Sequence, residues 1–332
     1  MIKQLKIGNF RGIRAGTVEN FTALNVLVGP SGSGKSTVID ALYLAGSPNL
    51  DTTQHPNQTL LMEITARRGS AGPAAMPGWL LWKVGREGNA IIDLRNDSFG
   101  GRRAIELKIT DPSGMLKASE NFTLTDKEAS NIGRSASELF FEDLGGVRIV
   151  SALKTSANEP QNEQLPDLFS ATTTAGQQDE LVDLLRKIDP KLQGLQILTQ
   201  MQQPFLTLKY SDYVVPVELA GDGVVSLIRF CMKLTAYPAR TLLIEEPELH
   251  LHYRAIQMAA RALWGAIRQG KQIILTTHSV DLIDSLVTEA SEDALPKLTV
   301  FQMRCDGGNL RVNPVPGPDV KFQRMQLEAE LR

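Results

Sequence analysis

Residues 29–36 read GPSGSGKS, and this octapeptide constrains the fold more strongly than any other part of the chain. It fits the pattern G-x-x-x-x-G-K-[ST], whose glycines let the backbone curl so that successive N–H groups point at one anion. The run before it, TALNVLVG, predicts a buried strand, and the run after it, STVIDALYLAG, predicts an amphipathic helix. A strand, a glycine-rich loop and a helix in this order predict an α/β fold with a nucleoside triphosphate at the positive end of the helix.

Individual loop residues have distinct expected roles. We expect the backbone N–H groups from about Gly32 to Ser36 to converge on the phosphates. Lys35 is predicted to reach the β and γ phosphates, and the hydroxyl of Ser36 is predicted to bind Mg²⁺. The pattern therefore predicts a triphosphate site that includes a divalent metal.

The composition is that of an ordinary globular protein. The chain has 332 residues, of which 42% are hydrophobic and 22% charged, so a large buried core is expected. Its 35 basic and 37 acidic residues give a net charge of −2, which provides no overall attraction to nucleic acid or an acidic membrane. Cys231 and Cys305 lack metal-ligand spacing, and no window reaches the ~18 apolar residues of a membrane span. We therefore expect a soluble, cytoplasmic protein.

Short alternating runs predict the elements between the loop and the last third of the chain. The first ten residues, MIKQLKIGNF, alternate like a strand. No heptad pattern extends over three or four repeats, so we expect no coiled-coil arm. The remaining expected elements are an antiparallel meander at 60–68, 79–86, 89–97 and 102–111, helices at 126–144 and 177–189, a strand at 146–153, a polar loop at 154–167, and three strands with the sequences LQILTQ, PFLTLKY and YVVPVEL.

A second group of candidate catalytic residues lies in the last third of the chain. The run TLLIEEPELHLHY begins with an apolar strand that ends in Glu245 and Glu246. A strand beside the phosphate loop delivers such carboxylates to the metal and to the attacking water in P-loop proteins. We expect Glu245 to orient a water on Mg²⁺ and Glu246 to accept a proton from the attacking water. A solvated acidic turn is the alternative interpretation.

His278 ends the next predicted strand, in the run KQIILTTHSVDLID. A histidine that leaves a core strand beside the carboxylate strand can sense the γ phosphate by a hydrogen bond. A purely structural histidine is the alternative. The same argument predicts that the two strands and the phosphate loop share one edge of the sheet.

Five segments in this order resemble the ABC-type ATPase heads of the RecF, SMC and OLD (overcoming lysogenization defect) lineage. They are IKQLKIGNFRGI, GPSGSGKSTVIDAL, AGDGVVSLIRF, LLIEEPELHLH and ILTTHS, and they span most of the chain. The resemblance implies a P-loop ABC-type ATPase fold with a mixed, partly parallel core sheet, an antiparallel β layer and a small helical lobe. It also implies ATP and Mg²⁺ as cofactors, ATP hydrolysis to ADP and phosphate, and a dimer that shares two nucleotides.

The resemblance assigns roles within one subunit. Glu245 is the expected metal-side carboxylate, Glu246 the catalytic base and His278 the switch histidine, and Arg11 approaches the phosphates from the N-terminal strands. The implied phosphate loop comprises Gly29, Pro30, Ser31, Gly32, Ser33, Gly34, Lys35, Ser36 and Thr37.

The resemblance also assigns roles between subunits. Gly221, Asp222 and Gly223 precede a predicted helix and correspond to the signature segment, which completes the nucleotide site of the partner subunit. Residues 247–252 correspond to a loop that crosses the dimer interface. Hydrolysis is therefore expected to depend on assembly.

The sequence departs from the family pattern at three places. Glu245 stands where aspartate is usual, and Ala220 replaces the usual signature serine, which removes a hydroxyl that would touch the γ phosphate. No glutamine can be assigned to the Q-loop, so the placement of the metal by that loop stays open. These departures keep a nucleotide-dependent scaffold with little hydrolysis among the alternatives.

The expected organisation is a single ABC-type ATPase head over residues 1–332. Its parts are a nucleotide-binding core at 1–68 and 191–313, an antiparallel β insertion at 69–125, and a helical lobe with a loop at 126–190.

The expected work of such a head is regulatory. ATP-bound and hydrolysed states would rearrange a homo-oligomer and gate a separate effector, a nuclease or a toxin, as in two-component phage defence. OLD proteins commonly continue into a Toprim nuclease domain, but only short predicted strands and a tail follow His278, so the effector is expected on another chain. A RecF-like ATPase that clamps DNA is the first alternative, and a transporter subunit, which needs a membrane partner, is disfavoured by the IGNFRG and GDG segments.

Overall fold

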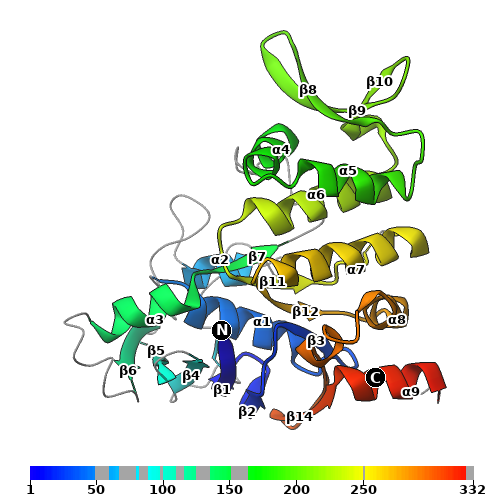
Figure 1. Ribbon diagram of the computed structural model, residues 1–332. Coiled ribbons are helices and arrows are strands. Elements are labelled where there is room, and N and C mark those ends of the chain that lie inside the picture. The colour runs from blue at the N-terminus through cyan, green and yellow to red at the C-terminus, as the bar shows by residue number, and fades with distance from the viewer. Residues whose placement is uncertain are drawn as a thin grey trace.

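A computed structural model shows a mixed α/β architecture, and it confirms the predicted fold class. The second, smaller sheet and the helices around it stand at one end of the molecule, and the strands β2 and β14 lie at the other end (Figure 1). The structure describes residues 1–48, 60–66, 80–81, 89–97, 100–109, 116–124, 135–150, 164–249 and 251–326.

One mixed sheet of eleven strands organises the described part of the chain, in the order β6-β5-β4-β1-β2-β14-β13-β3-β12-β11-β7. The five strands from β13 to β7 run parallel, whereas β1, β2, β4, β5 and β6 pair antiparallel. The strands are β1 (Ile2–Phe10), β2 (Ile13–Glu19), β3 (Leu24–Val28), β4 (Asn89–Asn96), β5 (Arg102–Ile109), β6 (Leu116–Thr123), β7 (Val147–Val150), β11 (Thr241–Glu245), β12 (Gln272–Thr276), β13 (Leu298–Asp306) and β14 (Asn309–Pro316).

Helices cover both faces of this sheet, which explains why every residue of β3 and β12 is buried, instead of alternate residues only. One face packs on α1 (Lys35–Gly46), α2 (Leu60–Ala66) and α3 (Ala136–Leu144). The other side carries α4 (Leu165–Thr174), α5 (Gln178–Arg186), α6 (Asp222–Ala236), α7 (Tyr253–Arg268), α8 (Val280–Glu289) and α9 (Gly317–Gln326).

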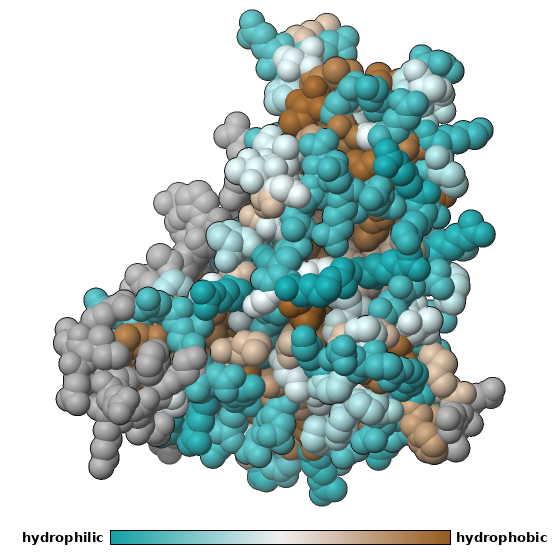
Figure 2. All heavy atoms as spheres, viewed as in Figure 1, coloured by the Kyte–Doolittle hydropathy of each residue, from teal (hydrophilic) through white to brown (hydrophobic). Residues whose placement is uncertain are grey.

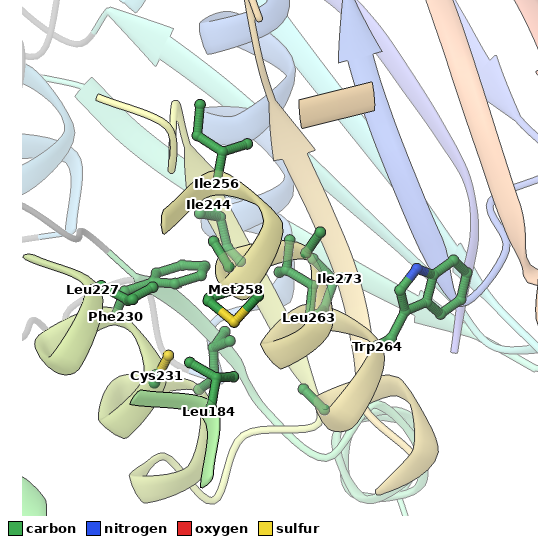
Figure 3. Packing of buried hydrophobic residues seen from close by; sticks show 14 of the residues in the cluster. Leu184, Leu227, Phe230, Cys231, Ile244, Ile256, Met258, Leu263, Trp264 and Ile273 are labelled. Carbon is green, nitrogen blue, oxygen red and sulfur yellow. The ribbon is translucent and has the colours of Figure 1, made fainter. Parts of the chain in front are cut away.

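The larger core lies between the sheet and helices α6 and α7. Phe230 of α6 and Met258 of α7 meet Ile244 and Ile273 of the sheet in this layer, and all four side chains are buried (Figure 3). Burial of a side chain of this size contributes about 1.5–3 kcal/mol. The layer therefore fixes β11 and β12, the two strands that carry the predicted catalytic residues.

A second sheet, with β8 (Gly194–Gln200), β9 (Gln203–Lys209) and β10 (Val214–Pro216), lies beyond α6 and packs on α4. We call α4, α5 and β8–β10 the distal lobe, which stands above α6 and α7 in Figure 1. Apolar atoms show at the surface of this end in Figure 2. The exposed apolar side chains on and beside these strands are Ile197, Met201, Tyr213, Val214 and Leu219.

Most of the predicted elements that fall on described residues are confirmed, and three interpretations need correction. Residues 60–68 were expected as a strand, but Leu60–Ala66 forms helix α2. Its Leu60 and Ile64 lie one helical turn apart and are both fully buried, so packing selects the helix. The expected tail after β14 contains a helix, α9.

Several predicted elements are only partly covered by the structure. The predicted helix at 126–144 is present as α3, and the strand at 146–153 as β7; the rest of both segments lies outside the described residues. Most of 79–86 and 154–167 also lies outside the described residues, but residues 165–167, expected in a polar loop, begin helix α4. Among the described helices, none is long and apolar enough to cross a membrane.

Arg103 of β5 connects the antiparallel strands to the end of α1. Its guanidinium is fully buried and donates to the carbonyl oxygens of Ala45, at 2.9 Å, and Ser47, at 2.5 Å. It also pairs with Glu120 of β6 and lies over the rings of Phe122 and Phe141. Because the last carbonyls of a helix lack intrahelical partners, this side chain holds the far end of α1 in place.

Replacing Arg103 with methionine should destabilise the protein by about 3 kcal/mol, because two buried carbonyls lose a charged donor. Urea unfolding followed by circular dichroism measures the change. Arg102→Met is the matched control, since Arg102 is the neighbouring residue on the same strand but its side chain is 43% exposed beside Asp93. Equal losses in both variants would contradict the role of Arg103.

Candidate functional site

The GPSGSGKS segment forms the expected loop between β3 and α1. Gly29, Gly32 and Gly34 have φ values of 146°, 81° and 94°, all in the region that favours glycine. A Cβ atom on Gly29 would also lie 2.3 Å from the carbonyl oxygen of Met303 in β13. The neighbouring strand therefore leaves no room for a side chain at this position, so only glycine fits.

Lys35 lies inside the loop that it is predicted to serve. Its Nζ donates to the carbonyl oxygens of Gly29, at 2.7 Å, and Pro30, at 3.1 Å, and approaches Ser33 Oγ at 3.5 Å. Burial lowers the pKa of Lys35, and the charge of Glu246 opposes that shift. The Lys35 ammonium therefore interacts electrostatically with the carboxylate that follows β11.

The parallel strands β3, β12 and β11 end at the same edge of the sheet. Thr276 of β12 is in register with Leu27 of β3 on one side and with Glu245 of β11 on the other. The amide of Thr277 donates to the carbonyl of Leu27 at 3.2 Å, and the amide of Glu246 donates to the carbonyl of Thr276 at 3.0 Å. The structure therefore brings both predicted carboxylates to the strand end that carries the phosphate loop.

Glu246 and His278 face each other at this edge. Their closest side-chain atoms, Oε1 of Glu246 and Nε2 of His278, are 3.7 Å apart. The side chains are 37% and 45% exposed, so both can reach a ligand from solvent. Glu246 has a φ of 44°, an uncommon value for a residue with a side chain, and such values concentrate at functional sites.

Glu248 joins the two strand ends, a role that the sequence analysis did not assign. Its Oε1 accepts hydrogen bonds from Thr277 Oγ1, at 2.6 Å, and from the backbone amide of His278, at 3.0 Å. The only signal in the sequence is a third carboxylate two residues beyond Glu246, inside the segment expected to cross a dimer interface.

Arg11 sits at the start of the loop between β1 and β2 with a φ of 49°. Its guanidinium pairs with Asp40, which is fully buried in α1, and its amide donates to the carbonyl of Leu80 at 2.7 Å. The structure thus ties Arg11 to the helix that follows the phosphate loop.

Gly221 is the N-cap of α6, and Asp222 and Gly223 form the first turn of this helix. Both Gly221 and Asp222 are exposed. Helix α6 packs on α4, α5 and α7, on the side of the sheet opposite α1. The structure therefore leaves the predicted signature segment at an exposed helix end that is separate from the phosphate loop of the same chain.

Within the described ranges, no three His, Cys, Asp or Glu side chains gather closely enough to hold a metal ion by themselves.

Two family models match the chain. Residues 87–284, more than half of the chain, match the family described as "AAA domain, putative AbiEii toxin, Type IV TA system". Residues 1–67 match a model described as "AAA ATPase domain". The first match covers β11 and β12, and the second covers the phosphate loop.

Relatives and solved structures support the same assignment. The chain is 22% identical to a protein of Helicobacter pylori named "ATP/GTP phosphatase", over 87% of this chain and 89% of that protein. It is 25% identical to an uncharacterized protein of Methanocaldococcus jannaschii, over 65% of this chain and 95% of that protein.

The fold is that of SMC ATPase heads. The SMC head bound to the C-winged helix domain of ScpA superposes with a TM-score of 0.61 at 14% identity, covering 95% of this chain and 97% of that chain. The SMC head domain from Thermotoga maritima gives a TM-score of 0.54 at 14% identity, covering 95% and 98%. The chain belongs to the family of AAA domains described as putative AbiEii toxin, type IV toxin–antitoxin system, and it is a P-loop ATPase with the fold of SMC heads.

Proposed function

We propose that this ATPase works as a nucleotide-dependent switch whose catalytic sites are shared between two copies of the chain. The observation that carries the proposal is the common edge of β3, β11 and β12, where the phosphate loop, Glu245, Glu246 and His278 come together. The exposed start of α6 on the other side of the sheet supplies the second half of each site.

The loop fits the triphosphate of ATP. Gly32 has a positive φ and open space where a side chain would stand, so its backbone can approach a phosphate closely. The buried ammonium of Lys35 offers the charge that the β and γ phosphates need, and it exchanges its bonds to loop carbonyls for bonds to phosphate oxygens. Arg11, held by Asp40 at α1, adds positive charge on the side of the N-terminal strands.

Ser36 and Glu245 are the proposed ligands of Mg²⁺, Ser36 directly and Glu245 through a water. A hydroxyl and a carboxylate oxygen suit this hard cation, and Mg²⁺ usually keeps several waters. The extra methylene of Glu245, relative to aspartate, still allows contact through a water. The metal supplies charge neutralisation at the phosphates.

Glu246 is the proposed general base. It accepts a proton from a water whose oxygen attacks the γ phosphorus, while the bond from that phosphorus to the β–γ bridging oxygen breaks. His278 donates a hydrogen bond to a γ phosphate oxygen and so reports whether this phosphate is present. The 3.7 Å between Glu246 Oε1 and His278 Nε2 supports the proposal that both side chains act at one γ phosphate.

The segment Gly221–Asp222–Gly223 is proposed to close the site of the second copy. Its helix end is exposed, and the adjacent Leu219 is 76% exposed, as expected of a surface that another subunit covers. The backbone N–H groups at the start of α6 take the place of the serine hydroxyl that Ala220 lacks.

Mixing two inactive variants tests the shared site. Lys35→Ala disables the loop of one copy, and Gly221→Val blocks the helix end of the other. No atom lies within 4 Å of a Cβ placed at Gly221 in the free protein, so the second variant should still fold. A mixture in equal amounts should regain about a quarter of wild-type ATP turnover, because half of the dimers carry one intact site of two.

Gly194→Val is the matched control, since a Cβ at Gly194 also meets nothing within 4 Å and Gly194 lies in β8 and not at the start of α6. It should remain active alone. Failure of the mixture to recover turnover, with both parents folded, would refute the shared site and leave a site contained in one chain.

The output of the switch is proposed to be a separate effector, a nuclease or a toxin, in a phage-defence setting of the OLD type in the cytoplasm. The description of the family as a putative toxin of a type IV toxin–antitoxin system supports a toxin–antitoxin setting and names no separate effector. A solved SMC head carries a bound protein domain, which supports partner binding by this fold. RecF-like DNA clamping is the alternative, and DNA-stimulated, salt-sensitive turnover would favour it.

A further inference from the structure

Glu248 lies where the turn after β11 meets the end of β12. The turn is closed by hydrogen bonds from the amide of Leu249 to the carbonyl of Glu246, at 3.1 Å, and from the amide of Leu251 to the carbonyl of Glu248, at 2.9 Å. This turn places the Glu248 carboxylate beside the end of β12, which is followed by His278.

One carboxylate oxygen fixes two consecutive residues of the β12 end. Oε1 of Glu248 accepts from Thr277 Oγ1 at 2.6 Å and from the His278 amide at 3.0 Å. Hydrogen bonds to a carboxylate are stronger than bonds between neutral groups. The backbone position of His278, and with it the start of its imidazole side chain, therefore depends on Glu248.

Thr277 extends this connection to the phosphate loop strand and to α8. Thr277 is 1% exposed, and its amide donates to the carbonyl of Leu27 in β3 at 3.2 Å. Its Oγ1 accepts from the amide of Ser279 at 2.9 Å, and Ser279 caps α8 through Leu282. A displacement of Glu248 would thus reach β3, β12 and α8 together.

The second carboxylate oxygen makes no such contact. Oε2 of Glu248 is buried and has no hydrogen-bond partner among the described residues. Burial of a carboxylate oxygen without a partner is unfavourable, so the two bonds of Oε1 must compensate for it. A side chain that served only as a surface acidic group would instead lie in solvent.

We infer that Glu248 is a positioning residue that holds His278 against the γ phosphate site and links it to the loop after β11. The inference rests on the proposed function of His278. It differs from a role in the dimer interface, because both bonds of Oε1 form within one chain.

Two substitutions of Glu248 distinguish its hydrogen bonds to Thr277 and His278 from its negative charge. Glu248→Ala removes the acceptor of both donors and should lower kcat about a hundredfold, since misplacement of a group by about 1 Å can have such an effect. The affinity for ATP, measured with a fluorescent analogue, should stay within about twofold, because the phosphate loop is unchanged. Glu248→Gln keeps an acceptor oxygen for Thr277 and His278 and should retain most of kcat.

A double-mutant cycle with His278→Ala tests the route of the effect. If Glu248 acts through His278, the double variant is no slower than His278→Ala alone. Multiplied losses of kcat in the double variant, or equal losses in Glu248→Ala and Glu248→Gln, would overturn the inference and leave the ATPase proposal intact. Failure of the proposed function would be recognised by a different result, namely ATP turnover that persists in Glu246→Gln.

Amide hydrogen exchange provides a readout that needs no turnover. Exchange in peptides that contain His278 and Ser279 should be faster in Glu248→Ala than in the wild type and close to the wild type in Glu248→Gln. Unchanged exchange in Glu248→Ala would show that the two bonds of Oε1 do not hold this segment.

Discussion

Replacing Glu246 with glutamine should lower ATP turnover at least about a hundredfold, because the amide cannot accept the proton of the attacking water. The substitution keeps the size of the side chain and leaves the phosphate loop intact. ATP should therefore still bind, and the complex should persist instead of decaying to ADP. Phosphate release and the fraction of ATP retained after gel filtration measure the two effects.

The same variant should change the assembly of the protein. If the start of α6 from a second copy completes the ATP site, ATP that is bound and not hydrolysed stabilises the dimer. Mass measurement in solution, across protein concentration and with and without ATP, should show a larger species for Glu246→Gln. Concentration-dependent turnover of the wild type is the corresponding kinetic result.

Glu292→Gln is the matched control for Glu246→Gln, since the Glu292 side chain is 82% exposed and pairs only with Lys321 among the described residues. It should behave as the wild type. Unchanged nucleotide retention and assembly in Glu246→Gln would contradict the assignment of the base. A protein that assembles constitutively and hydrolyses no ATP would instead favour the scaffold alternative.

Replacing Lys35 with alanine should weaken ATP binding about a hundredfold, because charged hydrogen bonds to phosphate contribute about 1.5–3 kcal/mol each. Isothermal titration calorimetry measures the affinity. Lys271→Ala is the matched control, because Lys271 is a half-buried lysine that also donates to two carbonyl oxygens, those of Tyr237 at 2.5 Å and Ala239 at 3.5 Å. It should alter stability without altering ATP affinity.

The pH dependence of ATP binding adds a second test of Lys35. Burial lowers the pKa of Lys35 below its ordinary value of 10.5, so the free protein loses this proton earlier than an exposed lysine would. The neutral amine attracts phosphate less, and affinity should fall as pH rises through the lowered pKa. Bound phosphates raise the pKa again, so binding in this pH range takes up a proton.

Lys35→Ala should lack the alkaline decrease that we expect in the wild type. An identical pH profile in the two proteins would show that Lys35 is not the group that titrates against the nucleotide.

The sequence alone determined the phosphate loop and its two flanking elements. The glycines at 32 and 34 are required locally, since their positive φ values disfavour other residues, and the largely apolar run of β3 predicts a buried strand. The run at 241–245 was also identified from the sequence as a strand, because it is a short apolar segment with one carboxylate at its end and a second directly after it. These features depend on neighbours in the chain.

Where the sequence interpretation was wrong, tertiary packing decided. Leu60–Ala66 alternates enough to suggest a strand, but burial of Leu60 and Ile64 against α1 selects a helix. The sequence also did not determine where β4–β6 lie. In the structure β4 pairs with β1, and this pairing joins the antiparallel strands to the sheet that carries the phosphate loop.

Within the site, the tertiary structure decided which charged groups meet. Glu246, Glu248 and His278 follow two strands that are neighbours only because β11 and β12 pair in parallel. Sequence patterns report which side chains an element buries, whereas hydrogen bonds across separate strand ends depend on the pairing of the whole sheet. The residue types of the site were therefore readable from the sequence, and the connection that Glu248 makes between them was not.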